Sequence, residues 1–215
     1  MLVGVNLTTF DIGSIEEGDF YVKFKIRCKK EDFISNLVFI YGPAQEDRKH
    51  SFLTELAHLS SKEDIPMIIG GDFNIMRGAE EKSKGSFNNR WPFLFNAVID
   101  AHNLRERDLA GRQFTWANNL EQQTFENLDR VLTTTEWELK YPRATVQALS
   151  REISDHTPLL LNSGDGNGIS PNANFKFELG WLLWDGFFQM VKNVWESTVS
   201  STNPMDRWQA KIRRL

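Results

Sequence analysis

Apolar and charged residues alternate over residues 20–27, where every second side chain is apolar. This period of two predicts a β-strand with one buried face. Residues 37–41 and 66–69 are apolar throughout, which is typical of strands in the middle of a sheet, and both runs end at glycine or proline. Weaker strand patterns occur at residues 1–6, 113–116, 128–132, 144–149 and 157–161.

Helical spacing of apolar residues occurs in residues 46–60 and 91–102, where they recur every three or four positions. Pro92 stands in the first turn of the second segment, a position that proline favours. Strands and helices interleave along the chain without a strict β-α-β repeat. This order predicts an α/β (α+β) fold in which helices are layered over a mixed sheet or a pair of sheets.

A polar stretch at residues 163–174 divides the chain, because it has almost no apolar side chains and is rich in glycine and asparagine. We interpret it as a flexible linker between a domain at residues 1–162 and a segment at residues 175–215. In that segment Trp184 and Trp195 share one helical face with apolar residues between them. This pattern predicts an amphipathic helix that docks on another element.

The composition is that of an ordinary globular protein, since 40% of the 215 residues are hydrophobic and 25% are charged. No apolar stretch reaches the ~18–20 residues that a transmembrane helix needs. Cys28 is the only cysteine, so the sequence has no pair for an internal disulfide and no cysteine-rich zinc motif. The net charge of −4 argues against nucleic-acid binding through charge alone. It does not exclude an enzyme that acts on phosphates through a metal ion held by carboxylates.

The sequence Gly-Gly-Asp-Phe-Asn at residues 70–74 directly follows a predicted buried strand. The glycines let the backbone pass closely, and the acid Asp72 and the amide Asn74 then point from one turn. Such a pair at the rim of a sheet is a candidate catalytic group. The alternative is that both side chains only cap the loop.

Ser-Asp-His at residues 154–156 leads into the last predicted strand of the domain. Asp155 and His156 are neighbours on an extended segment, so their side chains face opposite ways. One could then meet a metal ion while the other meets a substrate phosphate. An aspartate that caps a turn beside a hydrogen-bonded histidine explains the motif equally well.

Asp129 lies within an otherwise apolar strand pattern, and a buried carboxylate without a partner costs several kcal/mol. Arg130 is adjacent in sequence and therefore faces away. His156 is the better candidate, because an acid that orients an imidazole is a recurring catalytic pair. Tyr41 stands at the end of another apolar strand, before Gly42-Pro43, and by itself is an ordinary core residue.

Taken together and in this order, the four motifs resemble those of the endonuclease/exonuclease/phosphatase superfamily, which has the fold of deoxyribonuclease I and exonuclease III. Its members carry Tyr-x-Pro, Gly-Asp-Phe-Asn, an internal acid before a hydrophobic strand, and a terminal Ser-Asp-His. The resemblance implies a four-layer α/β/β/α sandwich. A narrower similarity, to the endonuclease region of plant LINE-type (non-LTR) retrotransposon polyproteins, rests on residues 41–44, 114–116, 128–132 and 175–178.

The resemblance implies metal-assisted, in-line hydrolysis of a phosphodiester. Asp72 would orient or deprotonate the attacking water, and Asn74 would help to hold the water and the scissile phosphate. His156 would donate a hydrogen bond or proton to a phosphate oxygen, and Asp129 would fix the tautomer of its ring. Asp155 would belong to the shell of a Mg²⁺ ion, with Mn²⁺ as a substitute, and Tyr41 would hydrogen-bond to the phosphate.

Members of this family bring an asparagine and then a glutamate, the principal metal ligand, well before the Tyr-x-Pro strand. No such motif precedes Tyr41 here. We therefore expect the N-terminal elements of the fold to be missing, and the loss of this metal ligand to lower the catalytic rate. Glu16, Glu17 and Glu31 do not match that ligand, because each lies in a turn-like or polar setting.

The resulting hypothesis is a domain that nicks DNA to leave a primer for the reverse transcriptase of the same polyprotein. A nuclear location follows only if this retroelement interpretation holds. The first alternative is a catalytically inactive remnant of such an element. The second is a phosphatase of the same fold, acting on inositol phosphates or lipids.

Overall fold

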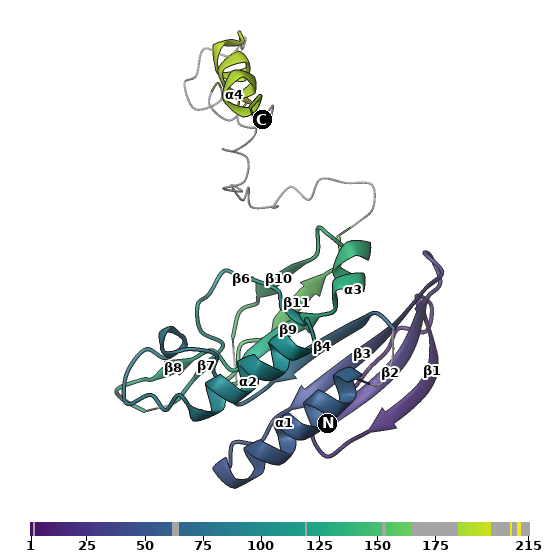
Figure 1. Cartoon of the computed structure of the whole chain (residues 1–215), viewed down its shortest axis with the longest axis vertical. Coiled ribbons are helices and arrows are strands. Elements are labelled where there is room, and N and C mark those ends of the chain that lie inside the picture. Colours follow the sequence, from purple (N-terminus) through teal and green to yellow (C-terminus); the bar gives the residue numbers. More distant parts are fainter. Residues whose placement is uncertain are drawn as a thin grey trace. The chain divides into compact units, whose positions relative to one another are not determined.

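The computed structural model describes residues 1, 3–61, 65–118, 120–151, 154–164, 185–198, 207 and 210–211. The chain divides into two compact units, Met1–Gly168 and Ile169–Leu215 (Figure 1). The boundary between them falls within the polar stretch that was interpreted as a linker.

The larger unit is built on a six-stranded sheet with the strand order β1-β2-β3-β4-β9-β5. β3 and β4 run parallel, whereas the other neighbouring strands are antiparallel. The strands are β1 (Phe10–Glu17), β2 (Tyr21–Cys28), β3 (Phe33–Tyr41), β4 (Met67–Asp72), β5 (Arg105–Glu106) and β9 (Asp129–Thr133).

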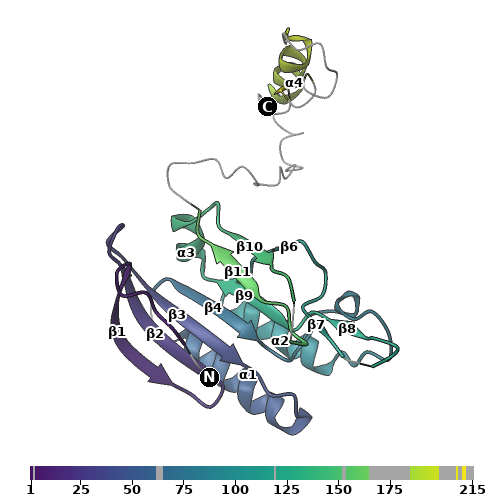
Figure 2. The same ribbon diagram turned by 180° about the vertical axis from the view of Figure 1, so that it is seen from behind.

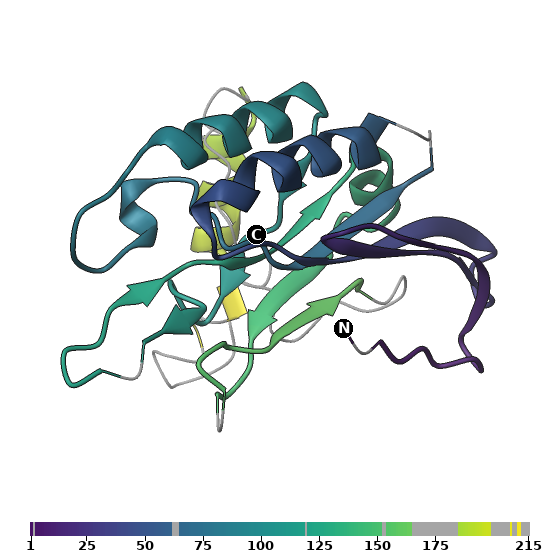
Figure 3. The same cartoon turned by 90° about the horizontal axis from the view of Figure 1, so that it is seen from below.

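Two helices lie side by side over one face of this sheet (Figure 3). α1 (Lys49–Ser61) continues from a short 3₁₀ turn (Glu46–Arg48), and α2 (Arg90–Ala101) follows a second one (Ala79–Glu81). Their apolar faces and alternate residues of β3, β4 and β9 form the main core. The fully buried side chains of this core include Phe52, Leu56, Phe95, Ile99, Ile69 and Leu132.

A smaller sheet covers part of the other face (Figure 2). Its strand order is β11-β10-β6, and its apolar residues pack against Ile68, Val131 and the buried Trp137. Helices, large sheet and small sheet thus form successive layers, and the predicted mixed α/β fold class is confirmed. The remaining elements are β6 (Leu109–Ala110), β7 (Trp116–Ala117), β8 (Phe125–Glu126), α3 (Thr135–Lys140), β10 (Thr145–Ala148) and β11 (Leu159–Asn162).

The strand predicted at residues 1–6 is wrong, because the described residues there form none, and the edge strand β1 follows instead. β1 is largely exposed, and a register shift between Ile12 and Ile15 interrupts its pairing with β2. Such a bulge breaks the alternation of apolar and polar positions. The sequence pattern was therefore too weak to predict this strand.

The smaller unit contains α4 (Phe187–Glu196), which covers part of the amphipathic helix that was predicted in the C-terminal segment. Trp184, which that prediction also used, and residues 175–178, on which the narrower similarity partly rests, lie outside the described residues. No described helix is long and apolar enough to cross a membrane.

The two phenylalanines of α2 provide a test of this packing. Phe95 is completely buried, and its ring lies 5.3 Å from that of Phe73, whereas Phe93 is 67% exposed. We expect Phe95→Ala to lower the free energy of unfolding by ~3–5 kcal/mol and Phe93→Ala to change it by less than ~0.5 kcal/mol. Urea denaturation followed by tryptophan fluorescence measures both. Equal losses would contradict the assigned face of α2.

Candidate active site

Three of the predicted site residues lie in a row across the end of the large sheet. Asp72, the last residue of β4, is in register with Tyr41 on β3 and with Asp129 on β9. Because side chains alternate between the faces of a strand, Asp72 and Asp129 share the face that carries Ile68 and Val131, opposite the helices. The phenol of Tyr41 is exposed at this edge, with 66% of the residue accessible.

Close backbone contacts shape the turn after Asp72. Gly71 has a φ of 142°, and a Cβ there would lie 2.1 Å from the carbonyl oxygen of Ile40. A Cβ on Gly42 would lie 2.3 Å from the carbonyl oxygen of Phe73. Glycine is therefore required at both positions for β3 and β4 to approach each other here.

Asn74 anchors this turn with φ at 51°, in the left-handed region that asparagine tolerates. Its backbone N–H donates to Asp72 Oδ1 at 2.9 Å. Its side-chain amide donates to Asp72 Oδ2 at 2.7 Å and to the carbonyl of Gly42 at 2.9 Å. The asparagine thus fixes the orientation of the Asp72 carboxylate, a contact compatible with either of the interpretations considered for this motif.

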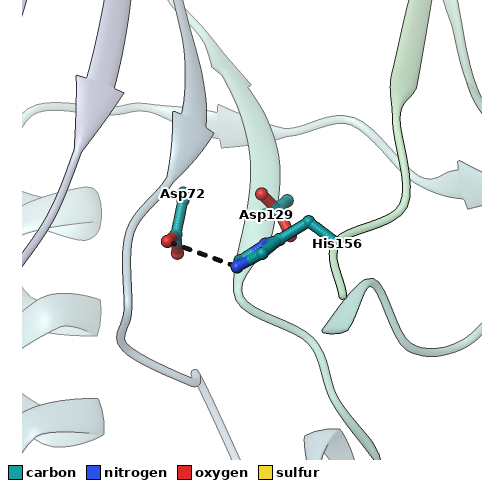
Figure 4. A group of neighbouring side chains, drawn as sticks. All are labelled: Asp72, Asp129 and His156. Carbon is teal, nitrogen blue, oxygen red and sulfur yellow. Dashed lines mark hydrogen bonds and ion pairs between the residues drawn. The ribbon is translucent and has the colours of Figure 1, made fainter. Parts of the chain in front are cut away.

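His156 lies between the two carboxylates (Figure 4). Its Nδ1 is 2.8 Å from Asp129 Oδ2, and its Nε2 is 3.8 Å from Asp72 Oδ2. The predicted pairing of Asp129 with His156 is therefore present, and the second ring nitrogen faces Asp72. The backbone N–H of His156 donates to Ser154 Oγ at 3.0 Å, which holds the turn that presents the ring.

Thr115 supports both partners of this pair and was not recognised as a site residue from the sequence. Its completely buried hydroxyl accepts hydrogen bonds from the backbone N–H groups of Leu128 and Asp129, at 3.0 and 2.9 Å. Its carbonyl accepts from the N–H of Thr157, next to His156, at 2.7 Å. A threonine just before a two-residue strand gives no signal of this kind, because both partners are distant in sequence.

Asp155 takes a different position from the other acids. Its Oδ2 accepts a hydrogen bond from the indole Nε1 of Trp116 at 3.0 Å, and its carbonyl accepts one from Arg151. The prediction that it binds a metal ion stays a prediction, since its carboxylate is not part of the cluster formed by Asp72, Asp129 and His156.

Burial and like charge shift the proton affinities of the cluster. Burial, followed by the negative charge of Asp129, raises the pKa of Asp72 to about 6. For His156, burial opposes protonation, but the hydrogen bond and charge of Asp129 outweigh this effect and raise the pKa of the imidazole. The hydrogen bond from Trp116 lowers the pKa of Asp155.

The cluster offers ligands that suit a divalent cation. One ligand atom from each of Asp72, Asp129 and His156 lies within 4.8 Å of the others. Carboxylate oxygens are preferred by Mg²⁺ and Mn²⁺, and imidazole is accepted by Mn²⁺ and by later transition metals. Because the carboxylate of Asp129 is already hydrogen-bonded to the imidazole of His156, the carboxylate of Asp72 is better placed to hold an ion.

The separation of Asp72 and His156 also suits proton transfer. An oxygen atom about 2.8 Å from both Asp72 Oδ2 and His156 Nε2 is compatible with their distance of 3.8 Å. A water molecule or a phosphate oxygen could therefore contact a base and a donor at once. This arrangement is compatible with general acid–base catalysis.

Comparison with known proteins agrees with this geometry at the level of the fold. The profile of the Endonuclease/Exonuclease/phosphatase family matches residues 5–156. A search of the curated protein sequences gave no match.

Several solved structures are similar to this chain. The endonuclease domain of TRAS1, a telomere-specific non-LTR retrotransposon, has a TM-score of 0.50 and 16% identity, over 66% of this chain and 63% of that domain. A mannosyl-6-phosphatase of Bacteroides thetaiotaomicron has a TM-score of 0.46 and 15% identity, over 72% and 67%. The catalytic domain of human Nocturnin has a TM-score of 0.42 and 13% identity, over 72% and 61%.

The chain spans less than two thirds of the TRAS1 domain, and at 16% identity this similarity shows the fold alone. The family profile covers well over half of the chain and includes all six predicted site residues, from Tyr41 to His156. The protein therefore belongs to the endonuclease/exonuclease/phosphatase family.

Proposed function

We propose that this protein is a Mg²⁺-dependent phosphodiesterase that nicks DNA. The observation that carries the proposal is the continuous contact from Asp129 through His156 to Asp72 at one edge of the large sheet. Such an arrangement places a proton acceptor and a proton donor on either side of one small volume.

Asp72 acts on the attacking water in this proposal. Its carboxylate is held by two hydrogen bonds from Asn74, so that Oδ2 faces His156 and the approaching substrate. A pKa of about 6 leaves it mostly ionised at neutral pH yet basic enough to take a proton from water. The same hydrogen bonds prevent the side chain from rotating away.

His156 acts as the hydrogen-bond donor to the phosphate in this proposal. With Nδ1 bonded to Asp129, its Nε2 is available to donate to a non-bridging oxygen or to the leaving oxygen. Tyr41, exposed in register with Asp72, is assigned a hydrogen bond to the phosphate, and Asp155 is assigned to the metal shell. A divalent ion held by the carboxylates would neutralise the negative charge that develops on the phosphate.

DNA as the substrate and a reverse transcriptase region as the partner are drawn from the sequence motifs that resemble LINE-type elements. Nicking would leave a 3′-hydroxyl primer for that polymerase, and the protein would then act in the nucleus. Two alternatives are compatible with the same family. The protein is then either an inactive remnant of a retroelement or a phosphatase for small esters. The substrate experiment below separates all three.

Supercoiled plasmid with Mg²⁺ is the direct test of DNA nicking. We expect His156→Ala and Asp129→Asn each to lower the nicking rate by roughly 10²–10⁴-fold, because the donor is removed or loses its orientation. His50→Ala, an exposed histidine on α1, is the matched control and should keep the wild-type rate. Wild-type protein no faster than His156→Ala would refute nicking by this chain and favour the remnant.

Removal of the metal is the second test. EDTA should abolish nicking, and either Mg²⁺ or Mn²⁺ should restore it, because the site offers mainly oxygen ligands. Para-nitrophenyl phosphate and inositol phosphates are assayed in parallel. Rapid hydrolysis of these esters by a protein that leaves plasmid intact would establish the phosphatase instead.

The activity should show a bell-shaped dependence on pH. Asp72 has to be ionised to accept a proton, and its pKa is about 6 without a metal ion, so the rate rises with pH on the acidic side. His156 has to be protonated to donate, so the rate falls again above the raised pKa of its ring. Initial nicking rates at saturating metal give the profile, and a bound ion moves the acidic limb to lower pH.

Nuclear magnetic resonance of the metal-free protein checks the same assignment without turnover. The His156 ring should titrate above an ordinary histidine, and Asp129→Asn should bring it back down, since a neutral amide removes the charge that favours the imidazolium. An unchanged His156 titration in Asp129→Asn would contradict the contact.

A further inference from the structure

Arg130 faces the side of the sheet opposite the catalytic cluster. It follows Asp129 in β9, and its guanidinium lies 5.6 Å from the centre of the Phe95 ring, beneath α2. The side chain is only 1% exposed. An arginine buried so completely has to be matched by acceptors, because its charge persists at all physiological pH values.

Two glutamates balance this charge. Nη1 donates to Glu81 at 3.1 Å and to both carboxylate oxygens of Glu106 at 3.0 and 3.1 Å. Arg77 adds a second positive charge, with Nη1 2.9 Å from Glu106 Oε2. The group of Arg77, Glu81, Glu106 and Arg130 is therefore neutral overall and connects β5, β9 and the segment that follows β4.

The other amino group of Arg130 reaches the two loops of the candidate site. Nη2 donates to the carbonyl of Ile75 at 3.2 Å and to the carbonyl of Asn127 at 2.8 Å. Ile75 directly follows Asn74, and Asn127 precedes the two residues whose N–H groups are held by Thr115. One planar guanidinium thus bridges the loop of Asn74 and the loop that leads into Asp129.

The stabilising effect of this buried guanidinium is limited. Its Nε is buried without a hydrogen-bond partner among the described residues, which carries a cost of ~1–3 kcal/mol. Replacing buried ion pairs by apolar residues is often neutral or stabilising. Stability alone is therefore a poor explanation for this group, whereas the two carbonyl contacts define a relative position of the loops.

We propose that Arg130 is a positioning residue, whose guanidinium sets the distance between the loop that carries Asn74 and the loop that leads into Asp129. The inference rests on the proposed hydrolytic function and extends it to the helix-covered face of the sheet. Asn74 is held on one side by Asp72 and Gly42, and Arg130 restrains the next carbonyl. Loss of that restraint would misplace Asn74 relative to the water and the phosphate.

Arg130→Lys is the informative variant, because it keeps the buried positive charge but loses the planar fork. A single ammonium cannot reach both carboxylates and both carbonyls. Arg107→Lys is the matched control, since Arg107 also forms a partly buried pair, with Glu138 at 2.9 Å, and bonds the carbonyl of Ala144. Thermal unfolding should show similar, modest losses of stability for the two variants.

The proposal predicts different kinetics for the two variants. In nicking assays on a duplex oligonucleotide, kcat of Arg130→Lys should fall by about 10- to 100-fold with KM nearly unchanged, as expected for a misplacement of about 1 Å. Arg107→Lys should keep the wild-type kcat. A wild-type kcat in Arg130→Lys, or the same loss in Arg107→Lys, would overturn the positioning role.

Backbone amide shifts give a readout that does not depend on activity. We expect the N–H resonances of Asn74 and Asp129 to move in Arg130→Lys and to stay in place in Arg107→Lys. If the wild-type protein nicks nothing, the proposed function fails, and these shifts still decide the restraint: unmoved resonances refute it. If Arg130→Lys does not fold, the triple variant R130M/E81Q/E106Q, which removes the buried charges together, is measured in its place.

Discussion

Two aspartates lie opposite each other in the pairing of β4 with β9, and the rest of the site depends on this placement. Asp72 and Asp129 are in register at the end of the two strands, on the same face of the sheet. Burial of Asp72, followed by the negative charge of Asp129 beside it, raises the pKa of Asp72 to about 6. Placing them together costs free energy, and each neighbouring group offsets part of that cost.

The neighbours that stabilise these acids also give them their chemical roles. The ring of His156 neutralises Asp129 when protonated and turns its free nitrogen toward Asp72. Asn74 donates two hydrogen bonds to Asp72, and Thr115 holds the backbone of Asp129. The same contacts thus stabilise the two aspartates and fix the orientation of their side chains. A site of this kind can be rigid before any substrate binds, which electrostatic catalysis requires.

The strands that carry the site could be predicted from sequence because they are central and strongly patterned. The apolar runs of β3 and β4 and the partner of Asp129 follow from burial, since a carboxylate in an apolar strand demands a nearby imidazole or cation. Edge elements could not be predicted in the same way. β1 is bulged and exposed, and β5, β6, β7 and β8 are each two residues long, too short for any periodicity.

Side chains that hydrogen-bond to peptide groups of other segments could not be predicted from the sequence either. The hydroxyl of Thr115 accepts from peptide N–H groups 13 and 14 positions away, and the guanidinium of Arg130 donates to peptide carbonyls 3 and 55 positions away. Peptide groups are identical at every position, so a side chain that binds one leaves no complementary residue type to find. Adjacent residues Asp129 and Arg130 show the limit well. Alternation along the strand correctly predicted that Arg130 lies on the other face. It could not predict the hydrogen bonds of Arg130 to both loops.

A phosphodiester, the substrate class that we propose, would add to the electrostatic repulsion at this site. It brings a further negative charge to an edge that already holds Asp72 and Asp129, and the positive charge of His156 is largely matched by Asp129. The chain as a whole carries a net charge of −4, so long-range attraction gives little help. Local cations have to compensate for the approach of the phosphate. This balance, rather than the identity of any one ligand, is the physical reason for assigning a divalent ion to the carboxylate cluster.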